Sequence, residues 1–414
     1  MLFPSQNRSV IPTVTNVASF KSLKAKTIMY SKLKKKLAFV TPLILALATE
    51  ISLSNIPAQA LQFNFNRPTG MSNDVFNAFD AAGNIWEGLL DDDATVNIKI
   101  GYASTVASNS LAETSVQHSS YTYSQFKDKL NTDQQSANDS QAVNALPSDS
   151  SFNIWLNYTS NNPNGLGNGT AYLDNDRDAN NTTVRMTRAN AKALSLLGGS
   201  DSNEDASIVL NSNKQWDFDR SDGISNSKYD IVGTIAHEIG HALGFMSGID
   251  YLDVNSPDPG GDYYPDNQFK YVAPMDLFRF SANSVAQGLG VVDFTSNNTD
   301  KYFSLTGGVT PFTESLTGKQ AYFSTGKRGN GFQNNHWKDN SIGLMGPSVQ
   351  SGKGLAMTYT DLRLLDVIGW DRIPGAVPAP APLTGVPEPS AVLGLMALGS
   401  GLLLKRAKQN KSEQ

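Results

Sequence analysis

The chain has 414 residues, enough for one large domain or two ordinary ones, and 39% of them are hydrophobic, which allows a sizeable folded core. It contains no cysteine, which excludes disulfides, thiolate metal sites and a propeptide that caps a metal through a thiolate. The net charge is −5, and basic residues gather at the two ends, so the middle is more acidic than the whole and nucleic acid is excluded as a partner.

The first 60 residues have the three parts of an export signal. Lysines at positions 32, 34, 35 and 36 precede an apolar run over 37–48, and Ala58-Gln59-Ala60 forms an A-x-A cleavage pattern. Met29 is the expected start of this signal. A membrane anchor or a buried helix is the alternative, but the apolar run is short for a span. The sequence therefore predicts a signal region over 1–60 and an exported protein, located outside the cell or in the cell envelope.

Residues 61–372 have the periodicities of one α+β domain. In chain order we predict a helix over 72–91, a strand over 94–102, a polar surface helix over 123–146, strands over 152–158 and 182–188, a helix over 191–197, a strand over 206–211, an apolar helix over 229–243 and a last helix over 360–368. Gly244 and Gly369 end the last two helices. Weak strands and loops over 260–335 make the C-terminal half loop-rich around a mixed sheet and a central helix.

The apolar helix carries the motif His237-Glu238-Ile239-Gly240-His241. Positions i and i+4 share one face of a helix, so both imidazoles can bind one cation. Zinc suits such neutral nitrogen ligands and lowers the pKa of a bound water toward ~7. Glu238 lies beside that water and can take its proton while the water attacks a carbonyl. The motif thus predicts zinc with Glu238 as general base.

A chance match on an apolar helix is the alternative, because short motifs of this kind do occur by accident. Two observations favour a site. The neighbouring residues are apolar, so three ionisable side chains there need partners. The chain also has only four histidines, and two of them lie in this motif. A catalytic zinc usually has a third protein ligand. For that ligand the sequence offers His336, Asp250 or Asp253, and Glu314.

Extended to Gly244, the motif reads H-E-x-x-H-x-x-G and resembles the metzincin clan of zinc peptidases. That resemblance implies a third histidine three residues beyond the glycine, where this chain has Ser247 instead. Some metzincins use an aspartate at that same position, but Asp250 comes three residues later.

A closer resemblance is to the leishmanolysin-like metzincins, in which the third histidine is displaced far downstream. It is carried by H-E-I-G-H-A-L-G-F over His237–Phe245, by His336-Trp337, and by Leu344-Met345-Gly346-Pro347. On this resemblance His336 is the third zinc ligand, and Met345 packs beneath the metal without binding it. The resemblance implies a metzincin-like fold and a zinc-dependent endopeptidase acting on protein or peptide substrates.

Other polar residues are weaker candidates for a functional site. His118 lies in a Ser/Thr-rich run and is predicted to be a solvated loop residue. Asp174, Asp176 and Asp178 alternate as in a calcium loop, but they lack its glycine and its final glutamate. The segment around 216–223 is a second candidate for calcium. The strand over 206–211 is expected to help line the substrate cleft.

The C-terminus has a second sorting pattern. A Pro/Ala-rich linker with the motif Val386-Pro387-Glu388-Pro389 spans 373–389, and an apolar stretch with a basic end follows over 390–414. Together these parts resemble the PEP-CTERM tail of bacterial exported proteins. The resemblance implies a short membrane helix, a sorting machinery as partner, and transient membrane association. A non-catalytic, zinc-stabilised protein of the cell surface or extracellular matrix is the alternative function.

Overall fold

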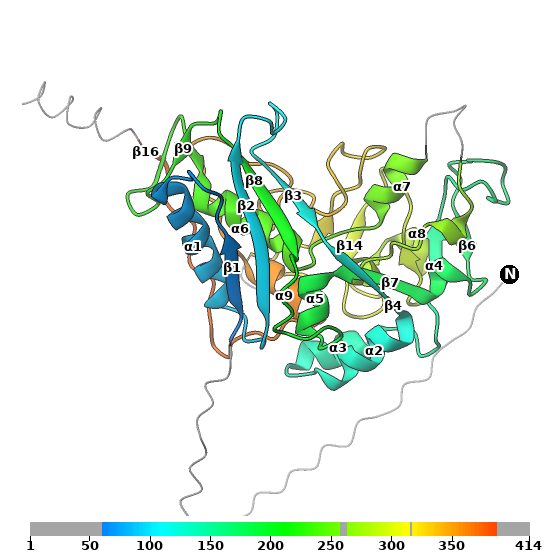
Figure 1. Cartoon of the computed structure of the whole chain (residues 1–414). Helices are drawn as coiled ribbons and strands as arrows, with labels where there is room; N and C mark the ends of the chain where they lie inside the picture. Colours follow the sequence, from blue (N-terminus) through cyan, green and yellow to red (C-terminus); the bar gives the residue numbers. More distant parts are fainter. Residues whose placement is uncertain (1–59, 257–262, 315–316, 387–414) are drawn as a thin grey trace, which may run out of the picture. The chain divides into compact units, whose positions relative to one another are not determined.

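The computed structural model describes residues 60–256, 263–314 and 317–386 (Figure 1). Nearly all of the predicted signal region lies outside them, as do the Pro-Glu-Pro residues 387–389 and the apolar tail over 390–414. Those predictions, and the domain boundaries drawn from them, stay predictions. Within the described ranges, no helix combines the length and the hydropathy needed to cross a membrane.

The described chain is a mixed α+β structure with several small sheets. Its helices are α1 (Asn73–Glu87), α2 (Tyr123–Thr132), α3 (Ala137–Ala145), α4 (Ala179–Thr182), α5 (Arg188–Ala193), α6 (Ile231–Leu243), α7 (Ile249–Asn255), α8 (Ala282–Val285) and α9 (Tyr359–Val367), with short 3₁₀ turns η1 (Asp266–Gln268) and η2 (Pro274–Phe278).

Its strands are β1 (Gln62–Asn66), β2 (Thr95–Ala103), β3 (Ala112–Val116), β4 (His118–Thr122), β5 (Ile154–Leu156), β6 (Tyr172–Asp174), β7 (Thr183–Thr187), β8 (Ala206–Asn211), β9 (Trp216–Asp217), β10 (Ile224–Ser225), β11 (Tyr229–Asp230), β12 (Arg279–Phe280), β13 (Val292–Asp293), β14 (Lys301–Phe303), β15 (Tyr322–Phe323) and β16 (Thr384–Val386).

The largest sheet has the strand order β1-β2-β8-β3. Strands β1, β2 and β8 run parallel, and β3 runs antiparallel to β8 at the edge. Alternating apolar residues of β2 are buried, among them Val96, Ile98 and Ile100. Helix α6 packs against β3 and β8, and α1 packs against α6 and β1 (Figure 1). The sheet thus places its antiparallel edge beside the helix that carries the predicted metal motif.

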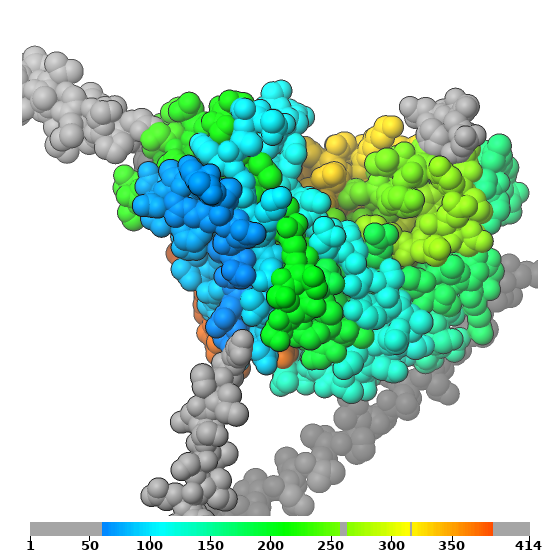
Figure 2. Space-filling view, viewed as in Figure 1, coloured from blue at the N-terminus to red at the C-terminus, as the bar shows by residue number. Residues whose placement is uncertain are grey.

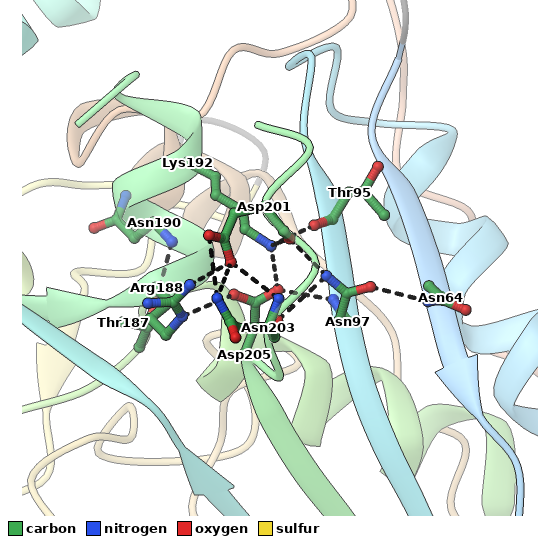
Figure 3. Close-up of polar contacts among 10 residues, drawn as sticks. All are labelled: Asn64, Thr95, Asn97, Thr187, Arg188, Asn190, Lys192, Asp201, Asn203 and Asp205. Atoms are coloured by element: carbon green, nitrogen blue, oxygen red, sulfur yellow. Dashed lines mark hydrogen bonds and ion pairs between the residues drawn. The ribbon is translucent and has the colours of Figure 1, made fainter. Parts of the chain in front are cut away.

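A buried ion pair ties α5 to this sheet (Figure 3). Lys192 Nζ lies 2.5 Å from Asp205 Oδ2, and both side chains are fully buried. The ammonium also donates to the carbonyls of Thr95 and Asp201, at 2.7 and 2.9 Å, while Asp205 accepts the main-chain N–H of Asn97 at 2.8 Å. Removing one partner from such a buried pair typically costs about 3–5 kcal/mol. The contacts hold β2 against the start of β8.

A side-chain cap starts helix α6, and a glycine ends it. The Asp230 side chain caps it by accepting the main-chain N–H of Gly233 at 2.9 Å, and Arg220 holds the same carboxylate at 3.0 Å. At the other end Gly244 has φ +125°, a conformation that L side chains rarely adopt, so the chain turns sharply away. The observed helix starts two residues later than predicted.

Most predicted elements are present, with shifted bounds. The helix predicted over 123–146 is two helices, because Ser136 starts a new one through a capping box with Asp139. The helix predicted over 191–197 forms earlier, as α5, after a cap by Thr187. Strands β3 and β4 were not predicted, since their Ser/Thr-rich sequence has no strong alternation.

The C-terminal half is loop-rich, as predicted, and packs around aromatic residues. Trp337 is fully buried, with its ring 5.0 Å from both Phe245 and Phe323. Arg279 is also fully buried; it lies over the Phe323 ring and donates to the carbonyls of Ser324 and Asn334. These contacts join the segment around residue 336 to the end of α6.

Candidate metal centre

Three histidines from distant parts of the chain meet at one point. His237 and His241 lie one turn apart on α6, and His336 comes from the loop after β15. The Nε2 atom of His237 is 3.1 Å from that of His241 and 3.2 Å from that of His336. All three side chains are at most 9% exposed. They form a buried cluster that could hold a metal ion such as zinc.

Main-chain carbonyls fix the orientation of each ring. The Nδ1 of His237 lies 2.9 Å from the Leu344 carbonyl, and that of His241 lies 2.8 Å from the Phe245 carbonyl. His336 Nδ1 lies 3.3 Å from the Gln333 carbonyl. A carbonyl only accepts, so each Nδ1 carries the proton and each Nε2 is left with a lone pair. Second partners of this kind orient metal-binding histidines in proteins.

The donor set fits zinc. The Nε2 lone pair of His237 faces those of His241 and His336 at 3.1 and 3.2 Å, and such lone pairs repel unless a cation lies between them. Zn–N bonds of about 2.05 Å at tetrahedral angles place ligand nitrogens roughly 3.3 Å apart, close to the spacing seen. Burial lowers the pKa of His241 to about 3, and His237 beside it acts in the same direction. Burial and the two neighbouring rings likewise hold the pKa of His336 well below its usual value. His241 and His336 therefore favour the neutral form that a metal ligand needs.

Glu238 lies next to this cluster at the edge of the main sheet. Its Oε2 accepts a 2.5 Å hydrogen bond from the hydroxyl of Thr114 on β3. Burial raises the pKa of Glu238, partly opposed by His237 and by the Thr114 bond. Thr114 was missed in the sequence, because nothing in a Ser/Thr-rich strand marks one hydroxyl as the partner of a distant carboxylate.

A cleft of about 710 Å³ opens over the histidines. One wall is β3 with the preceding residues 109–111, and another wall is formed by residues 331–333, 335, 336 and 346–349. In Figure 2 the surface is hollowed between the cyan segments of the N-terminal half and the yellow segments of the C-terminal half. The strand at the cleft is β3. The expected cleft strand 206–211 is β8, which lies one position further into the sheet.

Met345 is fully buried against α6. A Cβ built on Gly240 would lie 2.4 Å from Met345 Sδ, so the glycine allows the methionine to approach the helix between the two zinc-motif histidines. Trp86 of α1 packs on the same point and donates its indole N–H to the Ala236 carbonyl at 3.0 Å.

The alternative third ligands lie elsewhere. Asp250 accepts the main-chain N–H groups of Asn334 and Asn335, at 2.6 and 3.2 Å, so it supports the loop that carries His336. Asp253 bonds to the Asn334 side chain at 3.0 Å. Glu314 accepts from the Thr317 main chain at 2.7 Å. Within the described ranges none of these carboxylates belongs to the histidine group.

Ser247 occupies the position at which the metzincin resemblance implied a third histidine. Its hydroxyl donates to Asp276 at 2.7 Å, and the next residue, Gly248, donates its main-chain N–H to the same carboxylate at 2.8 Å. Asp276 is fully buried and also contacts Arg279. Ser247 therefore anchors the loop after α6 to the loop-rich half.

His118 is not a solvated loop residue, so that prediction was wrong. It lies in β4 opposite Thr187, and its Nε2 is 2.5 Å from the hydroxyl of Tyr271. Of the calcium candidates, Asp217 and Asp219 accept from nearby Ser225 and Ser221. In the described structure neither belongs to a metal-sized group of acidic side chains.

No known protein family, no curated protein and no solved structure matches this chain.

Proposed function

We propose that this chain is an exported, zinc-dependent endopeptidase. The observation that carries the proposal is the convergence of three neutral Nε2 atoms, from His237, His241 and His336, beside the carboxylate of Glu238. A zinc ion held there would supply Lewis-acid chemistry, polarising a carbonyl and acidifying water. Catalytic zinc sites typically have three protein ligands and an open position, and this set has that number.

Glu238 is placed to accept and return a proton. It follows His237 directly, and its carboxylate faces the cleft while Thr114 holds one of its oxygens. The other oxygen has no hydrogen bond among the described contacts. A carboxylate with a hydrogen bond at one oxygen can still accept a proton at the other oxygen. A purely structural metal site would not need this residue.

The cleft suits an extended chain. β3 pairs with β8 along one edge, and within the described residues its other edge has no strand partner. A peptide lying there could pair its main chain with β3, which binds substrate with little dependence on sequence. The acidic middle of the chain and the polar lining of the cleft give no sign of a nucleic-acid substrate.

The main test of this proposal compares Glu238→Gln with the control variant Glu204→Gln. Glu204 is exposed and lies well before the motif in the sequence. Wild type and both variants should each bind one zinc per chain, measured by metal analysis. Casein cleavage should fall at least about 100-fold in Glu238→Gln alone. Cleavage retained in that variant would remove Glu238 from the reaction. Zinc without hydrolysis in wild type would instead indicate a zinc-stabilised surface protein.

The proposal also includes export and recognition of the C-terminal tail. Both are predicted from the sequence patterns over residues 1–60 and 373–414. Cleavage after Ala60, membrane association through 390–414 and recognition of that tail by a sorting machinery are expected in a bacterial host. Mass spectrometry of protein recovered from the envelope and medium tests them. A product that retains residues 30–60 would contradict the predicted signal.

A further inference from the structure

We propose that the chain has a second cation site, for calcium, formed by Asp174, Asp176 and Asp266. One carboxylate oxygen from each lies within 4.8 Å of the others, close enough to share one ion. Asp174 ends β6, Asp176 follows in the next loop, and Asp266 begins η1. None of the three lines the cleft above the histidines. The site would be separate from the proposed zinc centre and does not depend on it.

Two of the three carboxyl groups are buried without an ion-pair partner in the described structure. Asp174 and Asp266 are 3% and 4% exposed, so water screens them poorly. In the described part of the chain, no ion pair involves any of the three. Arg177, which directly follows Asp176, pairs instead with the exposed Asp149 at 3.1 Å. Buried charges need a partner, and here a cation would be that partner.

Asn180 gives independent support. It is 1% exposed, and its side-chain oxygen Oδ1 has no hydrogen-bond partner. Its Nδ2 lies 2.7 Å from Asp174 Oδ2, so the amide group reaches the cluster. Oδ1 is bonded to the same carbon as Nδ2, so it lies near the Asp174 end of the cluster. An unpaired buried amide oxygen is costly, and a bound cation would satisfy it.

The donor chemistry selects calcium over zinc. The available groups are carboxylates and an amide oxygen, with no imidazole, and hard cations prefer such oxygen ligands. Calcium accepts six to eight ligands in irregular arrangements, so water can complete the shell on the exposed side at Asp176. Burial and the neighbouring carboxylates raise the pKa of Asp174 to about 7, so calcium would displace a proton from it near neutrality.

The site differs from the one that the spacing of Asp174, Asp176 and Asp178 suggested. Asp178 accepts the main-chain N–H of Asn180 and caps α4, so it belongs to the helix start. Asp266, 92 residues after Asp174, takes its place. Its Oδ2 accepts from the Tyr172 hydroxyl at 2.9 Å, and its Oδ1 accepts from the Asn161 side chain at 2.7 Å. Calcium would therefore join two loops that are distant in sequence.

Terbium luminescence and thermal unfolding test the site in the zinc-loaded protein. Tyr172 is close enough to excite a bound Tb³⁺, and added calcium should displace it at one site per chain. We expect Asp266→Asn and Asp174→Asn to weaken calcium binding at least tenfold with unchanged zinc content. Asp222→Asn, at an exposed aspartate of the other candidate segment, should bind calcium as wild type does. Wild type without saturable terbium or calcium binding would overturn the proposal.

The variant Asp176→Asn separates a loss of calcium binding from a loss of folding. Asp176 is exposed, and removing its charge relieves repulsion in the cluster. In calcium-free buffer its melting temperature should equal or exceed that of wild type, while the rise on adding calcium should shrink. A calcium-induced rise as large as in wild type would contradict the assignment.

Discussion

The carboxylate of Asp361 lies against the indole of Trp337, whose Nε1 donates it a hydrogen bond of 2.8 Å. Trp337 directly follows His336. Asp361 also accepts the main-chain N–H of Leu344 at 2.8 Å, and the carbonyl of Leu344 orients His237. One buried side chain on α9 is therefore linked to two of the three histidines.

We expect Asp361→Asn to weaken zinc binding by about 10- to 100-fold, the usual cost of losing a group that orients metal ligands. The amide NH₂ would face main-chain N–H donors, so the free energy of unfolding should also fall, by about 1–3 kcal/mol. Zinc affinity is measured by competition with a chromophoric chelator, and stability by urea unfolding of zinc-free protein. Wild-type zinc affinity in the folded variant would show that Asp361 only supports the fold.

His336→Ala tests the displaced ligand directly, with His118→Ala as its matched control. Loss of one imidazole should lower zinc affinity by several orders of magnitude and abolish the stabilisation that added zinc gives to wild type. His118 lies outside the cluster, so its variant should bind one zinc normally. Metal analysis after dialysis against a weak chelator distinguishes the two. Equal zinc content in both variants would rule out His336 as a ligand.

The parts of the site that lie on one helix could be predicted from the sequence, because spacing along a helix determines which side chains share a face. His237, Glu238 and His241 needed only the 3.6-residue repeat. His336 is 95 residues beyond His241, and no periodicity links the two. It was identified through the resemblance of the surrounding segments, and the structure places it in the cluster.

Contacts made by short polar strands and loops could not be predicted. Thr114, Asp266 and Asp276 act through tertiary packing, and their local sequences do not differ from ordinary loops. Asp361 did leave a signal, since Thr358-x-x-Asp361 is a capping box at the start of α9. That signal predicts a helix start, but not the second role of the same carboxylate at Trp337.

Gly248 lies just after α6, at a point where two parts of the main chain come very close together. A Cβ on it would lie 1.4 Å from the main-chain carbonyl oxygen of Tyr271, and a main-chain atom cannot move aside cheaply. We expect Gly248→Ala to destabilise the protein by about 3 kcal/mol or more. Gly198→Ala is the control, because its Cβ would meet nothing within 4 Å. Urea unfolding compares the two, and equal stabilities would contradict the close approach.

His118 should make stability depend on pH. Burial, followed by the charge of Arg185, lowers the pKa of His118 to about 4, whereas in the unfolded chain the value is about 6.5. Between pH 6.5 and pH 4, His118 is protonated in the unfolded chain but not in the folded chain. The stability that the neutral His118 contributes to the folded chain is therefore complete above pH 6.5 and is lost as the pH falls toward 4.

The variant His118→Asn lacks this titration. The free energy of unfolding should therefore fall more steeply in wild type than in the variant as pH drops from 7.5 to 4.5. Urea unfolding in zinc-free buffer measures both, and subtracting one curve from the other removes the other titrating groups. A difference that stays constant with pH would mean that His118 does not titrate differently in the folded chain, despite its contact with Tyr271.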